Sequence, residues 1–361
     1  MQVEEIKKAA AEVLSQIAAT NQPANEILNA YTRSRRYIGS KDRRTLAELV
    51  WGVLRHRARL EWAHPKTPFI EKIDYFLNKD YVRVDAPDWV RFEVPEWLME
   101  HIAEPQIELP ALLEMPETIL RANGDRGKIK KLLADEGIET IETALSPYGL
   151  ILQKRANLKQ SACYKKGLIE VQDEGSQLVA LETGIKPGMS VLDYCAGAGG
   201  KSLILAQMMQ DKGKIIAHDI SMRSLNELVR RAKRAGTKII RTHPKITVEA
   251  YKDGFDHVVV DAPCSGTGTW RRCPDARWKL TPQLFDSLLD KQHAILKKAK
   301  EFVGSKGRLS YMTCSLTTDE NDDQVDRFLT ENPGFIIEKR VQYSPARTHT
   351  DGLYVAVMRR V

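Results

Sequence analysis

The chain has 361 residues, of which 42% are hydrophobic and 29% charged, and its net charge is +7 at neutral pH. This length predicts two or three domains with ordinary cores, and the positive charge favours nucleic acid over an acidic membrane surface as partner. The opening MQVEEIKKAA lacks the pattern of a secretory signal, and no stretch approaches the ~18 apolar residues of a membrane span. We therefore expect a soluble, cytoplasmic protein without a membrane partner.

The five cysteines, at positions 163, 195, 264, 273 and 314, include no CxxC pair. An odd number of widely separated cysteines supports neither a disulfide framework nor a zinc site. We expect reduced thiols and no metal, so that any functional cysteine acts through its reactivity.

Residues 1–105 have the periodicity of an all-α domain. Apolar residues recur at helical spacing in VEEIKKAAAEVLSQIAA, and a second amphipathic run covers SKDRRTLAELVWGVLRHRARLEW, with Ser40 as its expected N-cap. Pro95 suits the first turn of another helix. The basic clusters RSRR, KDRR and RHRAR lie among Tyr37, Trp51 and Trp62. This interleaving favours an RNA or phosphate surface over merely solvated helix faces.

Residues 106–172 change character. Four strand-like pieces surround one helical segment, DRGKIKKLLADEG, and these pieces are ETILRAN, IETIETAL, LILQK and LIEVQDE. We predict a small α+β module in this region.

From residue 173 to 361, strand, turn and helix alternate. Strands are expected in SVLDYC, KIIAHD, TKIIRT, FDHVVVDAP, KGRLSYMTC and DGLYVAVMRR. The alternation predicts an α/β, Rossmann-like architecture, with a parallel sheet covered by helices on both faces. Ligands of such sheets bind beyond the carboxyl ends of the strands.

The stretch LDYCAGAGGKS places a glycine-rich turn between a strand and a helix. The P-loop pattern GxxxxGK[ST] does not fit, because its first glycine, five residues before Gly200, is replaced by Cys195. The dinucleotide-binding pattern GxGxxG does not fit either, because its third glycine is absent. Two interpretations remain open: a mononucleoside site in which Gly197, Gly199 and Gly200 let the ligand approach the backbone, and a plain tight turn. Asp219 ends the next expected strand, 19 residues after Gly200, as an acid that binds a ribose diol would. Without a pyrophosphate to bind, S-adenosylmethionine is the best candidate cofactor.

Two cysteines follow expected strands, Cys264 in VVVDAPCSGTG and Cys314 in SYMTCSL. In one parallel sheet both thiols would open onto the same crevice. Methylation at carbon 5 of a pyrimidine needs a thiolate, since addition to C6 makes C5 nucleophilic, and Asp261 is placed to stabilise the adduct near N3. The target atom is inaccessible in a stacked helix, so the base must be single-stranded or flipped. Chemistry alone allows either cysteine to attack.

The motifs DYCAGAGGK, DAPCSGTG, RRCPDARW and TCSL resemble, in this order, those of the NOL1/NOP2/Sun family of RNA cytosine-5 methyltransferases. The N-terminal helices resemble the NusB-like domain of the bacterial, RsmB-type branch that methylates 16S ribosomal RNA. The resemblance implies an all-α NusB-like RNA-binding domain (1–105), a small α+β RNA-binding module (106–172) and a Rossmann-like methyltransferase domain (173–361).

The same resemblance implies roles for individual residues. Cys314 would be the nucleophile, Cys264 would assist proton removal or product release, and Asp261 would contact the base. The residues implied in holding S-adenosylmethionine are Cys195, Ala196, Gly197, Ala198, Gly199, Gly200, Lys201, Asp219 and Asp261, whereas Asp193 would orient the turn. In RRCPDARW the residues implied in touching RNA are Arg271, Arg272 and Arg277, with a cluster of loop salt bridges as the alternative.

Two features depart from the family pattern. Gly197 and Ala198 stand where the family's turn has alanine and proline, which makes the turn less rigid. The acid that the family places after the third strand has no clear match, and His243 or a neighbour is the candidate substitute. Cys163 and Cys273 match no catalytic position.

We therefore expect a monomeric S-adenosylmethionine-dependent RNA (cytosine-5) methyltransferase. Small-subunit ribosomal RNA is the expected substrate, and transfer RNA is the second choice. The missing third-strand acid favours an alternative, an RNA-binding or ribosome-assembly protein with weak or lost turnover. A nicotinamide oxidoreductase gives no reason for paired thiols.

Overall fold

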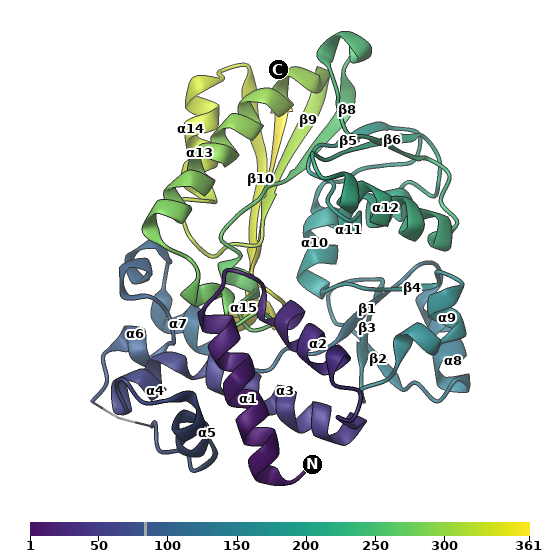
Figure 1. The fold of residues 1–361 in the computed structure, drawn as a ribbon. Coiled ribbons are helices and arrows are strands. Elements are labelled where there is room, and N and C mark those ends of the chain that lie inside the picture. The colour runs from purple at the N-terminus through teal and green to yellow at the C-terminus, as the bar shows by residue number, and fades with distance from the viewer. Residues whose placement is uncertain (83–84) are drawn as a thin grey trace. The chain divides into compact units, whose positions relative to one another are not determined.

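The structure is a computed structural model in which residues 1–82 and 85–361 are described (Figure 1). Contacts divide the chain into two compact units. The helical unit comprises residues 1–115 and 269–284, and the sheet unit comprises residues 116–268 and 285–361. The expected small module shares the sheet unit with the large sheet, and the helical unit ends after residue 115 rather than 105. The division into three domains stays a prediction.

The helical unit is built from short amphipathic helices. Its elements before residue 115 are α1 (Val3–Ala18), α2 (Ala24–Ser34), α3 (Ser40–Arg55), α4 (Arg57–Ala63), α5 (Phe69–Leu77), α6 (Asp88–Arg91), the 3-10 helix η1 (Glu96–His101) and α7 (Pro105–Ala111). Apolar faces of α1, α2, α3 and α5 form one core. None of the described helices of the chain is long and apolar enough to cross a membrane.

Three local predictions for this unit need correction. The N-cap of α3 is Gly39, and Ser40 is the first helical residue. The run expected from residue 40 to 62 breaks at His56, whose backbone leaves the helical region between α3 and α4. Pro95 precedes a 3-10 helix rather than an α-helix. Helix boundaries of this kind depend on tertiary packing, which the periodicity of apolar residues does not reveal.

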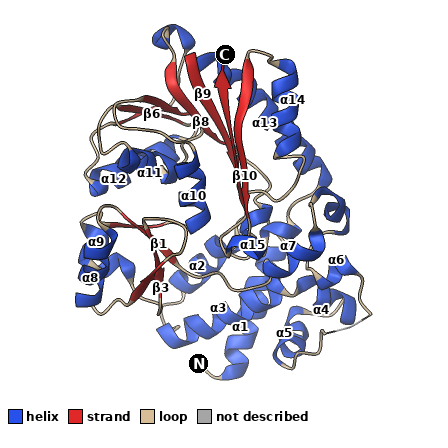
Figure 2. Ribbon diagram, turned by 180° about the vertical axis from the view of Figure 1, so that it is seen from behind, coloured by secondary structure: helices blue, strands red, loops and turns tan. Residues whose placement is uncertain are grey.

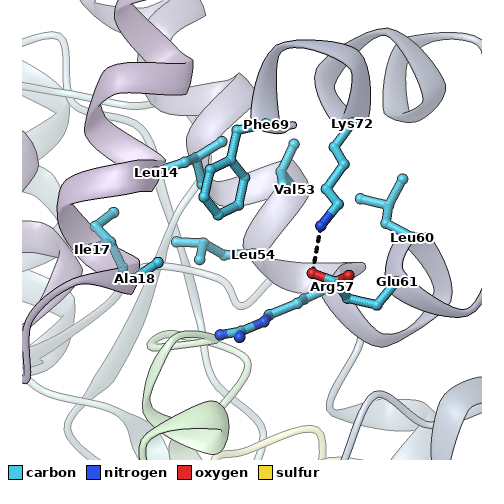
Figure 3. A pocket seen from close by; sticks show the side chains of 10 residues that line it. All are labelled: Leu14, Ile17, Ala18, Val53, Leu54, Arg57, Leu60, Glu61, Phe69 and Lys72. Atoms are coloured by element: carbon cyan, nitrogen blue, oxygen red, sulfur yellow. Dashed lines mark hydrogen bonds and ion pairs between the residues drawn. The ribbon is translucent and has the colours of Figure 1, made fainter. Parts of the chain in front are cut away.

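A small apolar cavity lies among α1, α3, α4 and α5 (Figure 3). Its lining residues are Leu14, Ile17, Ala18, Val53, Leu54, Arg57, Leu60, Glu61, Phe69 and Lys72. Lys72 and Glu61 form an ion pair of 2.5 Å at its edge. The cavity measures about 20 Å³, which is room for about one water molecule, so it cannot hold a nucleotide.

Residues 269–284 pack within the helical unit through buried polar groups. The Arg277 guanidinium is fully buried and donates to the carbonyl oxygens of Glu93 (2.9 Å) and Trp270 (3.4 Å). The carboxylate of Asp275 accepts a hydrogen bond of 3.0 Å from the amide of Ala24 at the start of α2. The helical unit therefore includes a segment that follows its first helices by more than 150 residues, since 269 − 115 = 154.

The sheet unit contains two sheets and the helices that cover them. The strands of the large sheet are β5 (Ser190–Asp193), β6 (Lys214–His218), β7 (Ile240–His243), β8 (Phe255–Asp261), β9 (Val303–Thr313), β10 (Phe335–Tyr343) and β11 (Leu353–Arg360). Their order is β10-β11-β9-β8-β5-β6-β7. The helices of the unit are α8 (Arg126–Asp135), α9 (Ala162–Lys165), α10 (Glu174–Glu182), α11 (Gly200–Met208), α12 (Met222–Ala235), α13 (Pro282–Ala299), α14 (Asp322–Glu331) and α15 (Pro345–Thr348).

The predicted α/β class is confirmed, but the large sheet is mixed rather than parallel. β5 to β9 pair in parallel, whereas β11 is antiparallel to both β9 and β10. The strand β10 was not predicted, because the charged residues Glu338, Lys339 and Arg340 interrupt its apolar pattern. Such charges are typical of an edge strand, which is where β10 lies.

Helices cover both faces of the large sheet (Figure 2). On one face α13 and α14 bury Leu296, Val325 and Phe328 against β8, β9 and β11. On the other face α10 and α11 bury Val179 and Ile204, among others, against β5, β6 and β11. The central strands are therefore enclosed on both sides, as their run of valines predicts.

The small sheet has the predicted α+β composition. Its strands are β1 (Ile119–Ala122), β2 (Thr140–Glu142), β3 (Gly149–Leu152) and β4 (Ile169–Val171), in the antiparallel order β2-β3-β1-β4. All four expected strand pieces and the expected helix, α8, are present. Its core includes Leu120, Ile129, Leu150 and Ile169.

We predict that Arg277→Met destabilises the helical unit by about 1–3 kcal/mol, because the buried carbonyl of Glu93 loses its donor. All six tryptophans of the chain lie in this unit, so urea unfolding followed by tryptophan fluorescence reports on it selectively. Arg36→Met is the matched control, since Arg36 is exposed and its loss should change stability by less than about 0.5 kcal/mol. Equal unfolding midpoints for Arg277→Met and wild type would contradict this structural role.

Candidate active site

The carboxyl ends of β5, β6, β8 and β9 lie along one edge of the large sheet. β5 pairs with β6 on one side and with β8 on the other, so the strand order reverses at β5. Crevices of α/β sheets that bind ligands form at such a reversal. The functional residues predicted in the sheet unit follow these four strand ends.

The glycine-rich turn connects β5 to α11. The residues predicted to hold a cofactor here are Cys195, Ala196, Gly197, Ala198, Gly199, Gly200 and Lys201, which run from the end of β5 into the first turn of α11. Gly199 has φ +87°, and a Cβ there would lie 2.5 Å from Cγ of Leu228. Gly197 has φ +52°, and a Cβ there would meet no atom within 4 Å. The turn is therefore closely packed at Gly199 and open at Gly197, where a ligand could approach the backbone.

Asp219 follows β6 and holds two backbone amides. Its carboxylate accepts hydrogen bonds from the amides of Gly197 (2.9 Å) and Ser221 (2.7 Å). The acid thereby ties the glycine turn to the start of α12. The next side chain, Ile220, is 92% exposed, which adds an apolar group beside this acid.

Asp193, the last residue of β5, is fully buried behind the turn. Its carboxylate accepts a hydrogen bond of 2.6 Å from the Ser202 hydroxyl in α11. Burial raises the pKa of Asp193 to about 7, against the lowering effect of the hydrogen bond from Ser202. Near neutral pH this carboxyl group therefore retains a proton in a fraction of molecules.

Asp261, the last residue of β8, forms an ion pair with Lys201. The Lys201 ammonium lies 3.2 Å from Oδ2 of Asp261 and 3.0 Å from the Ser176 hydroxyl. Lys201 is buried, whereas Asp261 is half-buried and so remains accessible. The ion pair joins the glycine turn to the strand end that precedes Cys264.

The two predicted thiols lie in contact. Sγ of Cys264 is 3.3 Å from Sγ of Cys314, and the Cys314 amide donates a hydrogen bond of 3.3 Å to the Cys264 sulfur. The hydrogen bond to Cys314, followed by burial and the charge of Glu320, raises the pKa of the Cys264 thiol well above its usual range. Cys264 therefore keeps its proton at neutral pH and can donate it in a hydrogen bond to the Cys314 sulfur.

A buried carboxylate holds the loops that carry these thiols. Glu320 is fully buried and accepts hydrogen bonds from the amide of Ser265 (2.7 Å), from Nε2 of Gln292 (2.9 Å) and from the Thr317 hydroxyl (3.2 Å). The Ser265 hydroxyl also donates to it. Gln292 donates in addition to the carbonyl of Pro263 (3.0 Å), so the loops after β8 and β9 are held together by several bonds.

Glu320 and Gln292 were not predicted from the sequence. Glu320 stands six residues after Cys314, just before α14, where an acidic residue favours any helix start. Gln292 lies in the middle of α13 and carries no local signal. The spacing from Cys314 to Glu320 is the one clue that the sequence contains.

The arginines predicted to touch RNA belong to the helical unit. Arg277 is fully buried on Glu93, and Arg271 is nearly so, with its carbonyl accepting a hydrogen bond of 2.9 Å from Arg55. Contact of Arg277 and Arg271 with RNA stays a prediction, which the burial of both side chains in this structure disfavours. Arg272 is half-buried and stays a candidate.

The remaining predicted residues have different surroundings. Cys195 packs against the core of the large sheet, and burial raises its pKa. Cys163 lies in the core of the small sheet, whereas Cys273 is exposed. β7 ends at His243, whose carbonyl lies 2.8 Å from Nδ1 of His218, and no acid follows directly. Among the described residues, no group of three or more His, Cys, Asp or Glu side chains could hold a metal ion.

Comparison with known proteins places this site in a family. The family described as 16S rRNA methyltransferase RsmB/F matches residues 180–359. The chain belongs to the RsmB/F family. The family expected from the four motifs is thereby confirmed. A probable ribosomal RNA small subunit methyltransferase B from Bacillus subtilis is 32% identical over 272 residues, which cover 68% of this RsmB/F chain and 60% of the relative.

Solved structures share the fold of this RsmB/F chain. The crystal structure of PH0851 has a TM-score of 0.81 at 22% identity and covers 100% of this chain and 99% of its own. A methyltransferase homologue from Pyrococcus horikoshii has a TM-score of 0.67 at 21% identity, over 76% of this chain and 100% of its own. At these identities the likeness concerns the fold alone. The chain spans about 60% of the length of the curated relatives it matches.

We predict that Asp193→Asn becomes more stable relative to wild type as the pH rises from about 5 to 7.5. Between the unfolded pKa of about 3.9 and the native value of about 7, the native state holds a proton that the unfolded state has lost. The contribution of Asp193 to the free energy of unfolding therefore falls as the pH rises through this range, and asparagine has no such proton. Thermal midpoints of both proteins across the range test this, and a difference independent of pH would contradict it.

We predict that Glu320→Gln lowers the free energy of unfolding by about 1.5–3 kcal/mol, because hydrogen bonds to a buried charge are lost. Iodoacetamide should also alkylate Cys264 faster in this variant, as peptide mass spectrometry can measure. Glu331→Gln, at the end of α14, is the matched control because Glu331 is 44% exposed. Equal alkylation rates in Glu320→Gln and wild type would show that Glu320 does not hold the loop.

Proposed function

We propose that the protein is an S-adenosylmethionine-dependent RNA (cytosine-5) methyltransferase that acts in the cytoplasm, as a monomer, on small-subunit ribosomal RNA. The observation that carries the proposal is the contact between the thiols of Cys264 and Cys314, which follow the ends of β8 and β9 at the carboxyl edge of the large sheet. A thiol pair in contact at this edge supports covalent chemistry on a base, whereas a plain core cysteine would lie within a strand. The names of the relatives support ribosomal RNA of the small subunit as substrate.

The residues around the glycine turn fit the proposed cofactor. The open side of Gly197 allows close approach to the backbone, Asp219 offers a carboxylate for a ribose, and Ile220 offers an exposed apolar surface for a base. Lys201 and Asp261 would border the same site. S-adenosylmethionine supplies, when bound, the methyl group that carbon 5 of the base receives.

The two thiols would perform different tasks. In the proposed reaction the Cys314 sulfur adds to C6 of cytosine, forming an S–C6 bond while the electron pair of the C5–C6 double bond moves toward C5. Cys264, which keeps its proton, would donate a hydrogen bond that stabilises negative charge on Cys314 before addition and again on release. The electron pair that moved toward C5 would form the bond from C5 to the transferred methyl group. A base would then remove the C5 proton, the electrons of the C5–H bond would re-form the C5–C6 double bond, and the S–C6 bond would break so that Cys314 leaves as a thiolate. Asp261 would contact the pyrimidine near N3.

A second function is supported by one observation. β7 ends at His243 without the acid that the family places there, which favours weak cofactor binding. The protein would then be an RNA-binding or ribosome-assembly protein with little turnover. Transfer RNA is the alternative substrate if turnover is retained.

We predict that Cys264→Ala, expressed in cells, accumulates covalently attached to RNA, because release of Cys314 from the adduct is impaired. The complex would appear as a slowly migrating band on a denaturing gel that ribonuclease removes, and sequencing of the trapped RNA would identify the substrate. The double variant Cys264→Ala with Cys314→Ala is the control and should form no adduct. Cys273→Ala, which changes an exposed thiol of the helical unit, should behave as wild type.

Three other results of this experiment would support different conclusions. Adduct with Cys314→Ala alone would reverse the roles of the two thiols. Trapped transfer RNA would change the substrate and keep the chemistry. Absence of adduct, together with wild-type protein that methylates no RNA, would favour the binding protein.

A further inference from the structure

The glycine turn is held by side chains from outside the strands that it connects. Nη1 of Arg231, in α12, donates a hydrogen bond of 2.7 Å to the carbonyl of Ala198. Nε2 of Gln172, directly after β4, donates a hydrogen bond of 3.1 Å to the carbonyl of Gly200. Two carbonyl groups of the turn, separated by Gly199, are therefore fixed by two side chains.

The small sheet positions the first of these donors. Nη2 of Arg231 lies 3.2 Å from the carboxylate of Glu170 in β4, and this carboxylate is only 4% exposed. Arg234, one turn further along α12, pairs with the same carboxylate but makes its other hydrogen bond to Tyr164 (2.8 Å) rather than to the turn. One guanidinium, that of Arg231, thus connects the small sheet directly to the glycine turn.

The small sheet also sets the orientation of the second donor. The Arg121 guanidinium, buried in β1, donates from Nε to Oε1 of Gln172 at 2.7 Å. Burial lowers the pKa of Arg121 to about 10, against the raising effect of Glu170, so it stays charged at neutral pH. Because arginine offers only donors, the amide oxygen of Gln172 must face Arg121 and its amide nitrogen must face Gly200. Arg121 also donates to Gln207 in α11.

We propose that the small sheet braces the cofactor turn, with Arg231 and Gln172 as positioning residues for S-adenosylmethionine. The inference rests on the proposed function, since it assigns the turn to that cofactor. Gly197 and Ala198 leave the turn free to adopt other backbone angles, and hydrogen bonds to the carbonyls of Ala198 and Gly200 restrict it to one conformation. A preorganised turn loses less conformational entropy when the cofactor binds.

Isothermal titration with S-adenosylhomocysteine, the demethylated form of the cofactor, tests the inference on the full chain. Arg231→Met should raise its Kd about tenfold, which corresponds to about 1.4 kcal/mol. Arg234→Met is the matched control, because it removes an ion pair with Glu170 but no contact with the turn, and its Kd should stay within about twofold of wild type. In turnover assays Arg231→Met should raise KM for S-adenosylmethionine and leave KM for RNA unchanged.

Two further variants separate positioning from general stability. Gln172→Glu keeps the acceptor for Arg121 and loses the donor for Gly200, so it should also weaken binding of S-adenosylhomocysteine. Arg231→Lys keeps one donor and should restore part of the affinity lost in Arg231→Met. Thermal unfolding midpoints of all variants identify any loss of affinity that comes from misfolding.

The outcomes distinguish this inference from the proposed function. Tight binding by wild type with an unchanged Kd in Arg231→Met and Gln172→Glu would overturn the brace and leave the methyltransferase proposal intact. An equal loss of affinity for S-adenosylhomocysteine in Arg231→Met and Arg234→Met would also overturn the brace, because the ion pairs of Glu170 alone would then explain the loss. Wild-type protein that binds no S-adenosylhomocysteine would overturn both proposals together.

Discussion

The buried carboxylate of Glu320 is the constraint on which the arrangement of the site depends. Two loops that are 50 residues apart in the sequence must bring Cys264 and Cys314 into contact, and strand pairing ends before either thiol. Glu320 accepts hydrogen bonds from both sides, through Ser265 in one loop and Thr317 in the other. A buried charge is costly unless such donors surround it, so the loops have one favourable arrangement, and that arrangement places sulfur against sulfur.

The three acids at neighbouring strand ends have different surroundings and therefore different uses. Asp193 is buried against a hydroxyl and is held partly neutral by burial. Asp219 is occupied by backbone amides and gives the glycine turn its shape. Asp261 is paired with Lys201 and is the one of the three that ends the strand leading to the Cys264 loop. One residue type at equivalent strand positions thus supports the fold, shapes a turn and lines the proposed base site.

The sequence contained the motifs of the site but few of the contacts that hold it. Cys264, Cys314, Asp219 and Asp261 could be predicted because each follows a strand with a strong local pattern, and parallel strands bring their ends together. Glu320 could not, because an acid before a helix has an ordinary local explanation. The brace on the turn also escaped, since Glu170 and Arg231 are 61 residues apart and only the fold makes them neighbours.

The same limit explains the errors. The family resemblance implied RNA contact for the loop RRCPDARW, and the sequence does not reveal that Arg277 is buried and donates to the carbonyl of Glu93. The strand β10 was missed because it is a largely exposed edge strand whose charged residues interrupt the apolar pattern. In both cases the prediction depends on which side of a segment faces the core. Contacts with residues distant in the sequence determine that side.

The inclusion of residues 269–284 in the helical unit has a consequence for synthesis. A ribosome that has released residue 115 must add 169 more residues before residue 284 emerges, since 284 − 115 = 169. At ordinary translation rates this takes roughly 10–30 s. During that interval the amino-terminal helices lack Arg277 and Asp275, which later occupy the carbonyl of Glu93 and the amide of Ala24. The first segment made is therefore completed only after residues 116–268 of the sheet unit have already left the ribosome.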